Sequence, residues 1–147
     1  SSGEDVGCAM YKLSASAPET LWESKGKKSV MENYWANSVY HDGYLYGITG
    51  HFHETKMHLN CVDAKTGKLM WSQKNYGKSA VTLADGHLYI TTFKGDVVLA
   101  KCNPMKYEEI SRAKLINQRR PTNATIADKR MYLRDHENIY CFDIAGK

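Results

Sequence analysis

The sequence predicts an all-β protein built from repeated antiparallel units. A short phrase recurs as Asp-Gly-Tyr-Leu-Tyr at 42–46, Asp-Gly-His-Leu-Tyr at 85–89 and Asp-Lys-Arg-Met-Tyr at 128–132. The leading aspartates are 43 residues apart both times. A constant period in the low forties, with turn residues that precede alternating apolar residues, is typical of the four-stranded blade of a β-propeller.

The Asp-Gly pairs at Asp42-Gly43 and Asp85-Gly86 predict two-residue turns between the first and second strands of two units. Glycine accepts a positive φ without steric cost, and aspartate hydrogen-bonds to the neighbouring backbone. The third copy has Lys129 in place of the glycine. We therefore expect its turn to be less tight or of another type.

A second phrase follows in each unit and is most complete at 59–71. It comprises a strand, a turn that begins at Asp63 and includes Gly67, and an outgoing strand that ends in Trp71. A degraded copy at 13–22 ends in Trp22, and another occupies 140–147. In the middle unit the aspartate and the tryptophan are both missing.

These phrases resemble those of the quinoprotein-dehydrogenase-like, or PQQ-like, β-propellers, over nearly the whole chain. The resemblance implies that Trp22 and Trp71 pack one blade against the next, and that the protein is extracytoplasmic, either periplasmic or secreted. The period divides the chain into the end of one blade, two full blades and the start of another. These expected units are 1–35, 36–78, 79–121 and 122–147.

About three and a half blades do not close a ring, because propellers close with roughly four to eight. Open sheet edges on both sides would be a liability. We therefore expect a partial ring that is completed by the remainder of the propeller or by a second copy of the chain.

The chain has a net charge of +4. No run approaches the roughly 18 apolar residues that a membrane-spanning helix needs, so no membrane span is expected. Basic residues gather in one stretch, but no aromatic residue lies among them to stack bases, which favours solvated loops over a nucleic-acid groove. These residues are Arg112, Lys114, Arg119, Arg120, Lys129 and Arg130.

The four cysteines contain no Cys-x-x-Cys pair. Cys61, Cys102 and Cys141 occupy equivalent or nearly equivalent positions in different units, which should be too far apart for disulfides. We expect all four to be buried free thiols. They are Cys8, Cys61, Cys102 and Cys141.

Three histidines, His51, His53 and His58, lie close together in the first full unit, with Glu54 among them. If a strand continues through them, residues 51 and 53 share a face, and two imidazoles on one face can bind zinc or copper. The alternative is an exposed polar hairpin loop, because the spacing provides no third ligand.

Three residues precede innermost strands and could line the central channel: Trp35, Asn37 and Asn123. The two asparagines stand five residues before Asp42 and Asp128, so they are repeat-equivalent, and Ala80 fills the same place between them. They could bind a ligand, or they could satisfy backbone groups at the entrance of a strand.

Enzymes of the resembling family hold pyrroloquinoline quinone and calcium with Glu, Asn and Asp ligands and use an Asp base. No position of this chain matches those residues, since only the repeat phrases match. We therefore expect a non-catalytic scaffold that binds a protein or another ligand, with no cofactor in this chain. The alternative is a fragment of a quinone-dependent alcohol or sugar dehydrogenase, which would require pyrroloquinoline quinone and calcium.

Overall fold

The structure is a computed structural model that describes residues 1–50, 57–117 and 122–145. Their strands form four antiparallel sheets, each of strands consecutive in the chain. The elements are β1 (Gly7–Lys12), β2 (Glu19–Lys25), the 3₁₀ helix η1 (Gly26–Lys28), β3 (Val39–His41), β4 (Tyr44–Thr49), β5 (His58–Asp63), β6 (Leu69–Gln73), β7 (Ser79–Ala84), β8 (His87–Thr92), β9 (Asp96–Lys101), β10 (Glu109–Lys114), β11 (Thr125–Ala127), β12 (Arg130–Arg134) and β13 (Ile139–Asp143). No helix among the described residues is long and apolar enough to span a bilayer.

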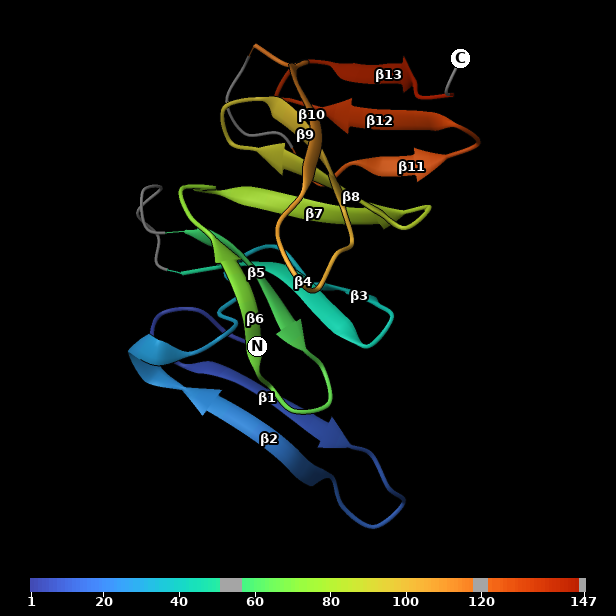
Figure 1. The fold of residues 1–147 in the computed structure, drawn as a ribbon. Helices are drawn as coiled ribbons and strands as arrows, with labels where there is room; N and C mark the ends of the chain where they lie inside the picture. Colours follow the sequence, from blue (N-terminus) through green and yellow to red (C-terminus); the bar gives the residue numbers. More distant parts are fainter. Residues whose placement is uncertain (51–56, 118–121, 146–147) are drawn as a thin grey trace.

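The sheets follow one another in chain order, from β1–β2 at one end to β11–β13 at the other (Figure 1). The sheets β3–β6 and β7–β10 have four strands each. Strands β3 and β4 contact β7, and β7 contacts β11, so the first strands of successive sheets lie side by side. This arrangement confirms the all-β fold and the four-stranded antiparallel blades, which form part of a propeller ring.

A separate hydrophobic core fills each gap between neighbouring sheets, as expected for blades that pack face to face. The largest lies between the two four-stranded sheets and includes the fully buried Tyr46, Leu59 and Leu88. The inner strand β4 is buried from Tyr46 to Thr49, whereas the outermost strand β10 is exposed along its whole length. The propeller is therefore held together by contacts between blades.

The three Asp-led turns have the same geometry. Both turn residues have a positive φ in each: 45° and 88° at Asp42-Gly43, and 49° and 61° at Asp128-Lys129. The expectation of a looser or different third turn is therefore wrong. The pairing of β11 with β12 leaves two residues between Ala127 and Arg130, and Lys129 adopts the left-handed conformation that this short loop requires.

The outer hairpin of each of the first three sheets contains a bulge at the same place. One residue of the last strand has no partner in the register, and it directly precedes Trp22, Trp71 or Ser111. A bulge changes the direction of the side chains that follow it. The residues without a partner are Leu21, Met70 and Ile110.

Both tryptophans that follow a bulge contact the next sheet. The indole N–H of Trp22 donates to the carbonyl of Ala64 at 2.8 Å, in the turn between β5 and β6. The indole N–H of Trp71 donates to the carbonyl of Asn103 at 2.8 Å, in the loop between β9 and β10. Both rings are half-buried. The bulges therefore place these rings against the turns of the following blade.

All four cysteines are free thiols. Cys8 and Cys61 are buried and Cys102 is half-buried, and burial raises the pKa of the Cys61 and Cys102 thiols to about 11. Cys141 is exposed, which corrects the expectation that all four are buried. It lies in β13, whose burial pattern alternates between half-buried and exposed residues.

Candidate functional site

The larger part of the candidate functional site is a cavity of about 510 Å³. It lies where the chain enters the innermost strands β7 and β11. Two of the three channel candidates, Trp35 and Asn123, line it, and so does Ala80. Asn37 is exposed and is not among the lining residues. The remaining lining residues are Lys78, Ser79, Thr91, Phe93 and Thr122.

Hydroxyl groups fix the strand entrances that form the walls of this cavity. The Thr91 hydroxyl donates to the carbonyl of Thr122 at 3.2 Å, and the Thr82 hydroxyl donates to the carbonyl of Ala124 at 2.8 Å. Both bonds join the sheet β7–β10 to the segment that enters β11. Backbone carbonyls of the next blade therefore hold its wall of the cavity in place.

Trp35 stands on a loop that is closed by Asn33. The Asn33 amide donates to the carbonyl of Ala36 at 2.8 Å and accepts from the Ser38 hydroxyl at 3.1 Å. Tyr34 packs edge-on against Trp35, with ring centroids 4.7 Å apart. Trp35 is 47% exposed. The loop thus presents a large ring to solvent in a conformation that local contacts hold.

The ammonium group of Lys78 lies near two aromatic rings of this cavity. Its Nζ is 5.4 Å from the ring centroid of Trp35 and 5.6 Å from that of Phe93. Both distances are within the roughly 6 Å at which a cation is attracted to the face of a ring. Trp35 and Phe93 therefore hold one positive charge at the edge of the cavity.

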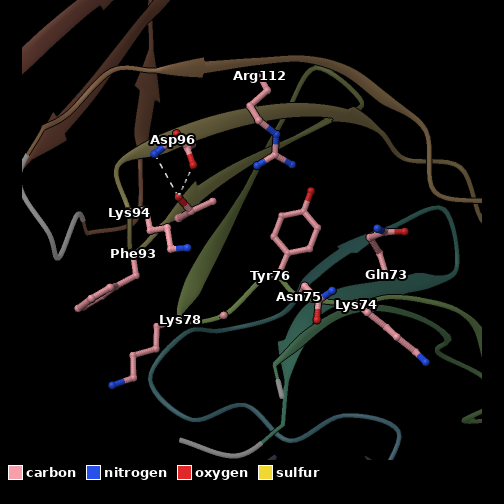
Figure 2. A pocket seen from close by; sticks show the side chains of 11 residues that line it. Gln73, Lys74, Asn75, Tyr76, Lys78, Phe93, Lys94, Asp96 and Arg112 are labelled. Carbon is pink, nitrogen blue, oxygen red and sulfur yellow. Dashed lines mark hydrogen bonds between the residues drawn. The ribbon is translucent and has the colours of Figure 1, made fainter. Parts of the chain in front are cut away.

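A second cavity, of about 320 Å³, adjoins the first and shares Lys78 and Phe93 with it. It lies between the connection from β6 to β7 and the turn from β8 to β9 (Figure 2). We call the two cavities together the connector groove. The other residues that line its second arm are Gln73, Lys74, Asn75, Tyr76, Gly77, Thr92, Lys94, Asp96 and Arg112.

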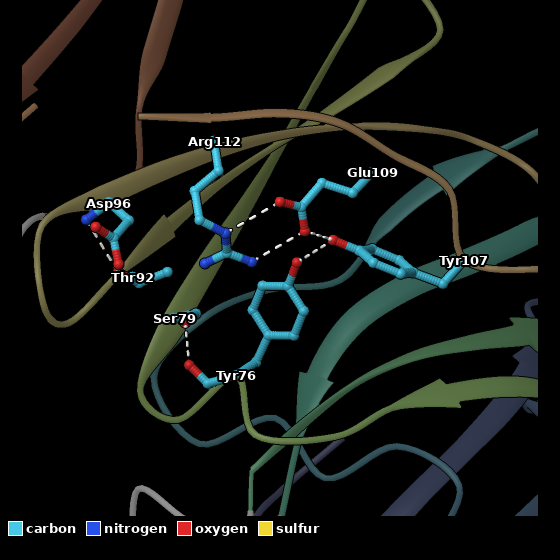
Figure 3. Close-up of polar contacts among 7 residues, drawn as sticks. All are labelled: Tyr76, Ser79, Thr92, Asp96, Tyr107, Glu109 and Arg112. Atoms are coloured by element: carbon cyan, nitrogen blue, oxygen red, sulfur yellow. Dashed lines mark hydrogen bonds and ion pairs between the residues drawn. The ribbon is translucent and has the colours of Figure 1, made fainter. Parts of the chain in front are cut away.

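A chain of hydrogen bonds supports the second arm (Figure 3). The Tyr107 hydroxyl donates to Glu109 Oε2 at 2.6 Å, so in the bond between the two tyrosine hydroxyls Tyr76 is the donor. Arg112 donates from Nε and Nη2 to the two oxygens of Glu109, each at 3.0 Å. These bonds join the connection that precedes β7 to the start of β10.

The ion pair between Glu109 and Arg112 stays charged at neutral pH. The hydrogen bonds from Arg112 lower the pKa of Glu109, and those to Glu109 raise the pKa of Arg112. Burial raises the pKa of Tyr107, and the bond to Glu109 raises it further. Tyr107 therefore keeps its proton, and the wall of the groove has a fixed pattern of donors and acceptors.

The proposed histidine metal site is placed only in part. His51 and His53 lie outside the described residues. His58 begins β5, and burial lowers its pKa, as does the positive charge of Lys74. In the described part of the chain, no group of three metal-binding side chains is close enough to hold a metal ion.

The repeat contains a signal for one groove residue that was not predicted, Lys78. Lys78 stands 43 residues after Trp35, just as Ala80 stands 43 residues after Asn37. Trp35 and Lys78 each stand two residues before these equivalent positions, so the same repeat relates them. Phe93 lies outside both repeat phrases, so no comparable signal pointed to it.

No family model and no curated protein sequence matches the chain. Among solved structures, it is similar to BamB from Moraxella catarrhalis, at a TM-score of 0.59 and 14% identity. The similarity covers 84% of this chain and 33% of that one, so the chain spans about a third of the length of BamB. The chain thus has the β-propeller fold, as a partial ring of antiparallel blades.

Proposed function

We propose that this chain is part of a non-catalytic β-propeller scaffold that binds a protein segment in the connector groove. The observation that supports this most directly is the groove itself, in which two connections between strands and an aromatic pair form adjoining cavities of about 510 and 320 Å³. Binding sites are typically concave, largely preformed and lined by apolar and aromatic side chains with a few placed polar groups. The remainder of the propeller, or a second copy, is the other partner that we propose.

The rigidity of the groove favours binding of a flexible segment. Hydrogen bonds hold the Trp35 loop, the entrance to β11 and the Tyr76 connection before any ligand arrives. A preformed site loses little conformational entropy when it binds, which improves affinity without further contacts. The likeness to the fold of BamB agrees with a scaffold role and with the proposed extracytoplasmic, periplasmic or secreted, location.

The quinone dehydrogenase alternative fits the residues near the axis less well. The family's enzymes hold calcium and pyrroloquinoline quinone there with Glu, Asn and Asp ligands. The described residues that line the larger cavity offer Asn123 and three hydroxyl groups but no carboxylate. Calcium sites use carboxylates as well as neutral oxygens. We therefore propose that this chain binds neither calcium nor the quinone at this place.

Peptide display tests the scaffold function. A random peptide library would be selected on the immobilised protein, and the enriched peptides would be measured against Trp35→Ala, Phe93→Ala and the control Tyr40→Ala. Tyr40 is 61% exposed and lies in β3 outside the groove. We expect peptides whose binding is lost in the first two variants and retained in the third. If every enriched peptide binds all variants equally, the groove is not the binding site.

Titration with pyrroloquinoline quinone and calcium tests the alternative. Cofactor absorbance and reduction of an artificial electron acceptor would be followed as the protein is added. We expect neither saturable binding nor turnover of alcohols or sugars. Stoichiometric binding with turnover would replace the scaffold proposal by the dehydrogenase.

A further inference from the structure

The connector groove is strongly cationic, and this property identifies the class of segment that it binds. Among the described residues, four cationic side chains and one carboxylate, that of Asp96, line its second arm. That carboxylate already accepts a hydrogen bond from the Thr92 hydroxyl, whose oxygen in turn accepts the Asp96 backbone N–H at 3.0 Å. The cationic residues are Lys74, Lys78, Lys94 and Arg112.

The lysines account for the excess charge. Arg112 is bound through two nitrogens to Glu109, so most of its charge is balanced locally. The backbone carbonyl of Lys94 accepts the ammonium group of Lys114, which brings another cation to this turn. Lys78 is held at the junction of the two arms by its two aromatic neighbours. The groove thus presents positive charge beside an aromatic surface.

We infer that the connector groove binds an extended peptide segment in which an aspartate or glutamate lies next to an aromatic or large aliphatic residue. This inference rests on the proposed scaffold function. The carboxylate would lie near Lys78 and Lys94, and the apolar side chain would enter the larger cavity against Trp35 and Phe93. An extended chain advances about 3.3–3.6 Å per residue, and its successive side chains point to opposite sides, so neighbouring residues can reach both arms at once.

Charge complementarity favours this occupant over a basic or neutral peptide. Like charges across an interface are unfavourable, and opposite charges raise the association rate and select the partner. A basic peptide would be repelled by the lysines of the second arm, whereas a neutral peptide would form no ion pair with them. A single-stranded nucleic acid also combines negative charge with stacking rings, but it requires a basic groove that follows several nucleotides. Among the described residues, the lysines of this groove line its second arm and only Lys78 also lines the larger cavity, which favours the peptide.

The test uses the peptides enriched by display on the wild-type protein. We expect most of them to contain Asp or Glu within two positions of an aromatic or large aliphatic residue. Changing that carboxylate to its amide should weaken binding about tenfold, as measured by fluorescence anisotropy, and raising the salt concentration should weaken the parent peptide more than its amide. Lys78→Gln and Lys94→Gln should reduce affinity for the acidic peptide and leave that for its amide almost unchanged.

Lys12→Gln, at the exposed end of β1, is the matched control and should change neither affinity. If Trp35-dependent peptides are enriched without carboxylates, or if the amide versions bind equally well, the inference is wrong and the scaffold function stands. If no enriched peptide depends on Trp35, both fail. If an oligo-dT strand binds through the same lysines more tightly than any enriched peptide, the groove is a nucleic-acid site and the inference is overturned.

Discussion

The indole N–H of Trp71 donates to the backbone carbonyl of Asn103, which joins β6 of one blade to the loop between β9 and β10 of the next. The ring also lies between two tyrosines, 6.0 Å from Tyr46 in its own sheet and 5.8 Å from Tyr107 in the following one. Trp71 therefore combines a directional bond with aromatic contacts on both sides of the interface. The bulge at Met70 gives the ring this direction.

Replacing Trp71 by alanine should destabilise the fold by about 3 kcal/mol, the lower end of the usual range for tryptophan, because the ring is only half-buried. Trp71→Phe keeps much of the ring contact but removes the N–H donor, so it should cost about 1 kcal/mol. Urea unfolding followed by circular dichroism gives both values. An alanine variant with the wild-type midpoint would contradict this role for Trp71.

Trp22 and Gly67 should be energetically coupled. A Cβ at residue 67 would lie 2.7 Å from the Trp22 ring, and φ there is 73°. Gly67→Ala therefore adds a clash to the backbone cost of about 1–2 kcal/mol for a left-handed residue. In the Trp22→Ala background the clash is absent, and only the backbone cost should remain.

A double-mutant cycle with urea unfolding measures this coupling. Gly43→Ala is the matched control, because φ at Gly43 is 88° and a Cβ there meets no atom within 4 Å. Its cost should be the same with and without Trp22. Simple additivity of Gly67→Ala and Trp22→Ala would show that the ring does not pack on the turn.

Lys129→Gly should stabilise the protein. Lys129 has a φ of 61°, which costs a residue with a Cβ about 1–2 kcal/mol, and glycine adopts this conformation without strain. The greater freedom of glycine in the unfolded chain offsets part of this gain, so we expect about 0.5–1 kcal/mol. A lower melting temperature for this variant than for wild type would contradict the turn geometry.

Gly86→Lys is the reverse substitution at the equivalent turn. Its φ is 67°, so it should destabilise by a similar amount. Both turns make the same bond at their second residue, since the carbonyl of Gly86 accepts from Cys102 and that of Lys129 from Ile144. A difference between the two variants would therefore reflect the turn residue itself.

The repeat phrases were sufficient to predict the sheets because each phrase determines the local structure of its own residues. Asp-Gly specifies a two-residue turn, and the alternation around it specifies paired strands. The prediction failed at Asp128-Lys129, where composition suggested another turn. There the register of β11 with β12 is stabilised by the core around Met131 and Leu133, and this packing imposes a conformation that lysine does not favour.

The groove was less predictable, because it is formed by residues that the repeat does not constrain. Trp35 and Asn123 were identified from their positions before inner strands. Phe93 and Arg112 come from a turn and an outer strand of one blade, and their place in the groove depends on how blades pack. A sequence period gives the order of blades but not the side chains that meet between them.

Acid should remove the contribution of the Glu109–Arg112 pair to stability. The pKa of Glu109 is lowered in the folded state, first by the hydrogen bonds from Arg112. Its contribution is therefore complete above the unfolded value of about 4.3 and is lost as the pH falls through the lower folded value. The difference in free energy of unfolding between wild type and Glu109→Gln should be largest near neutral pH and decrease below about pH 4.

Urea unfolding from pH 3 to 7 measures this difference, with Glu19→Gln, an exposed position at the start of β2, as the control. A difference that is constant with pH would mean that the Glu109 carboxylate gains nothing from Arg112.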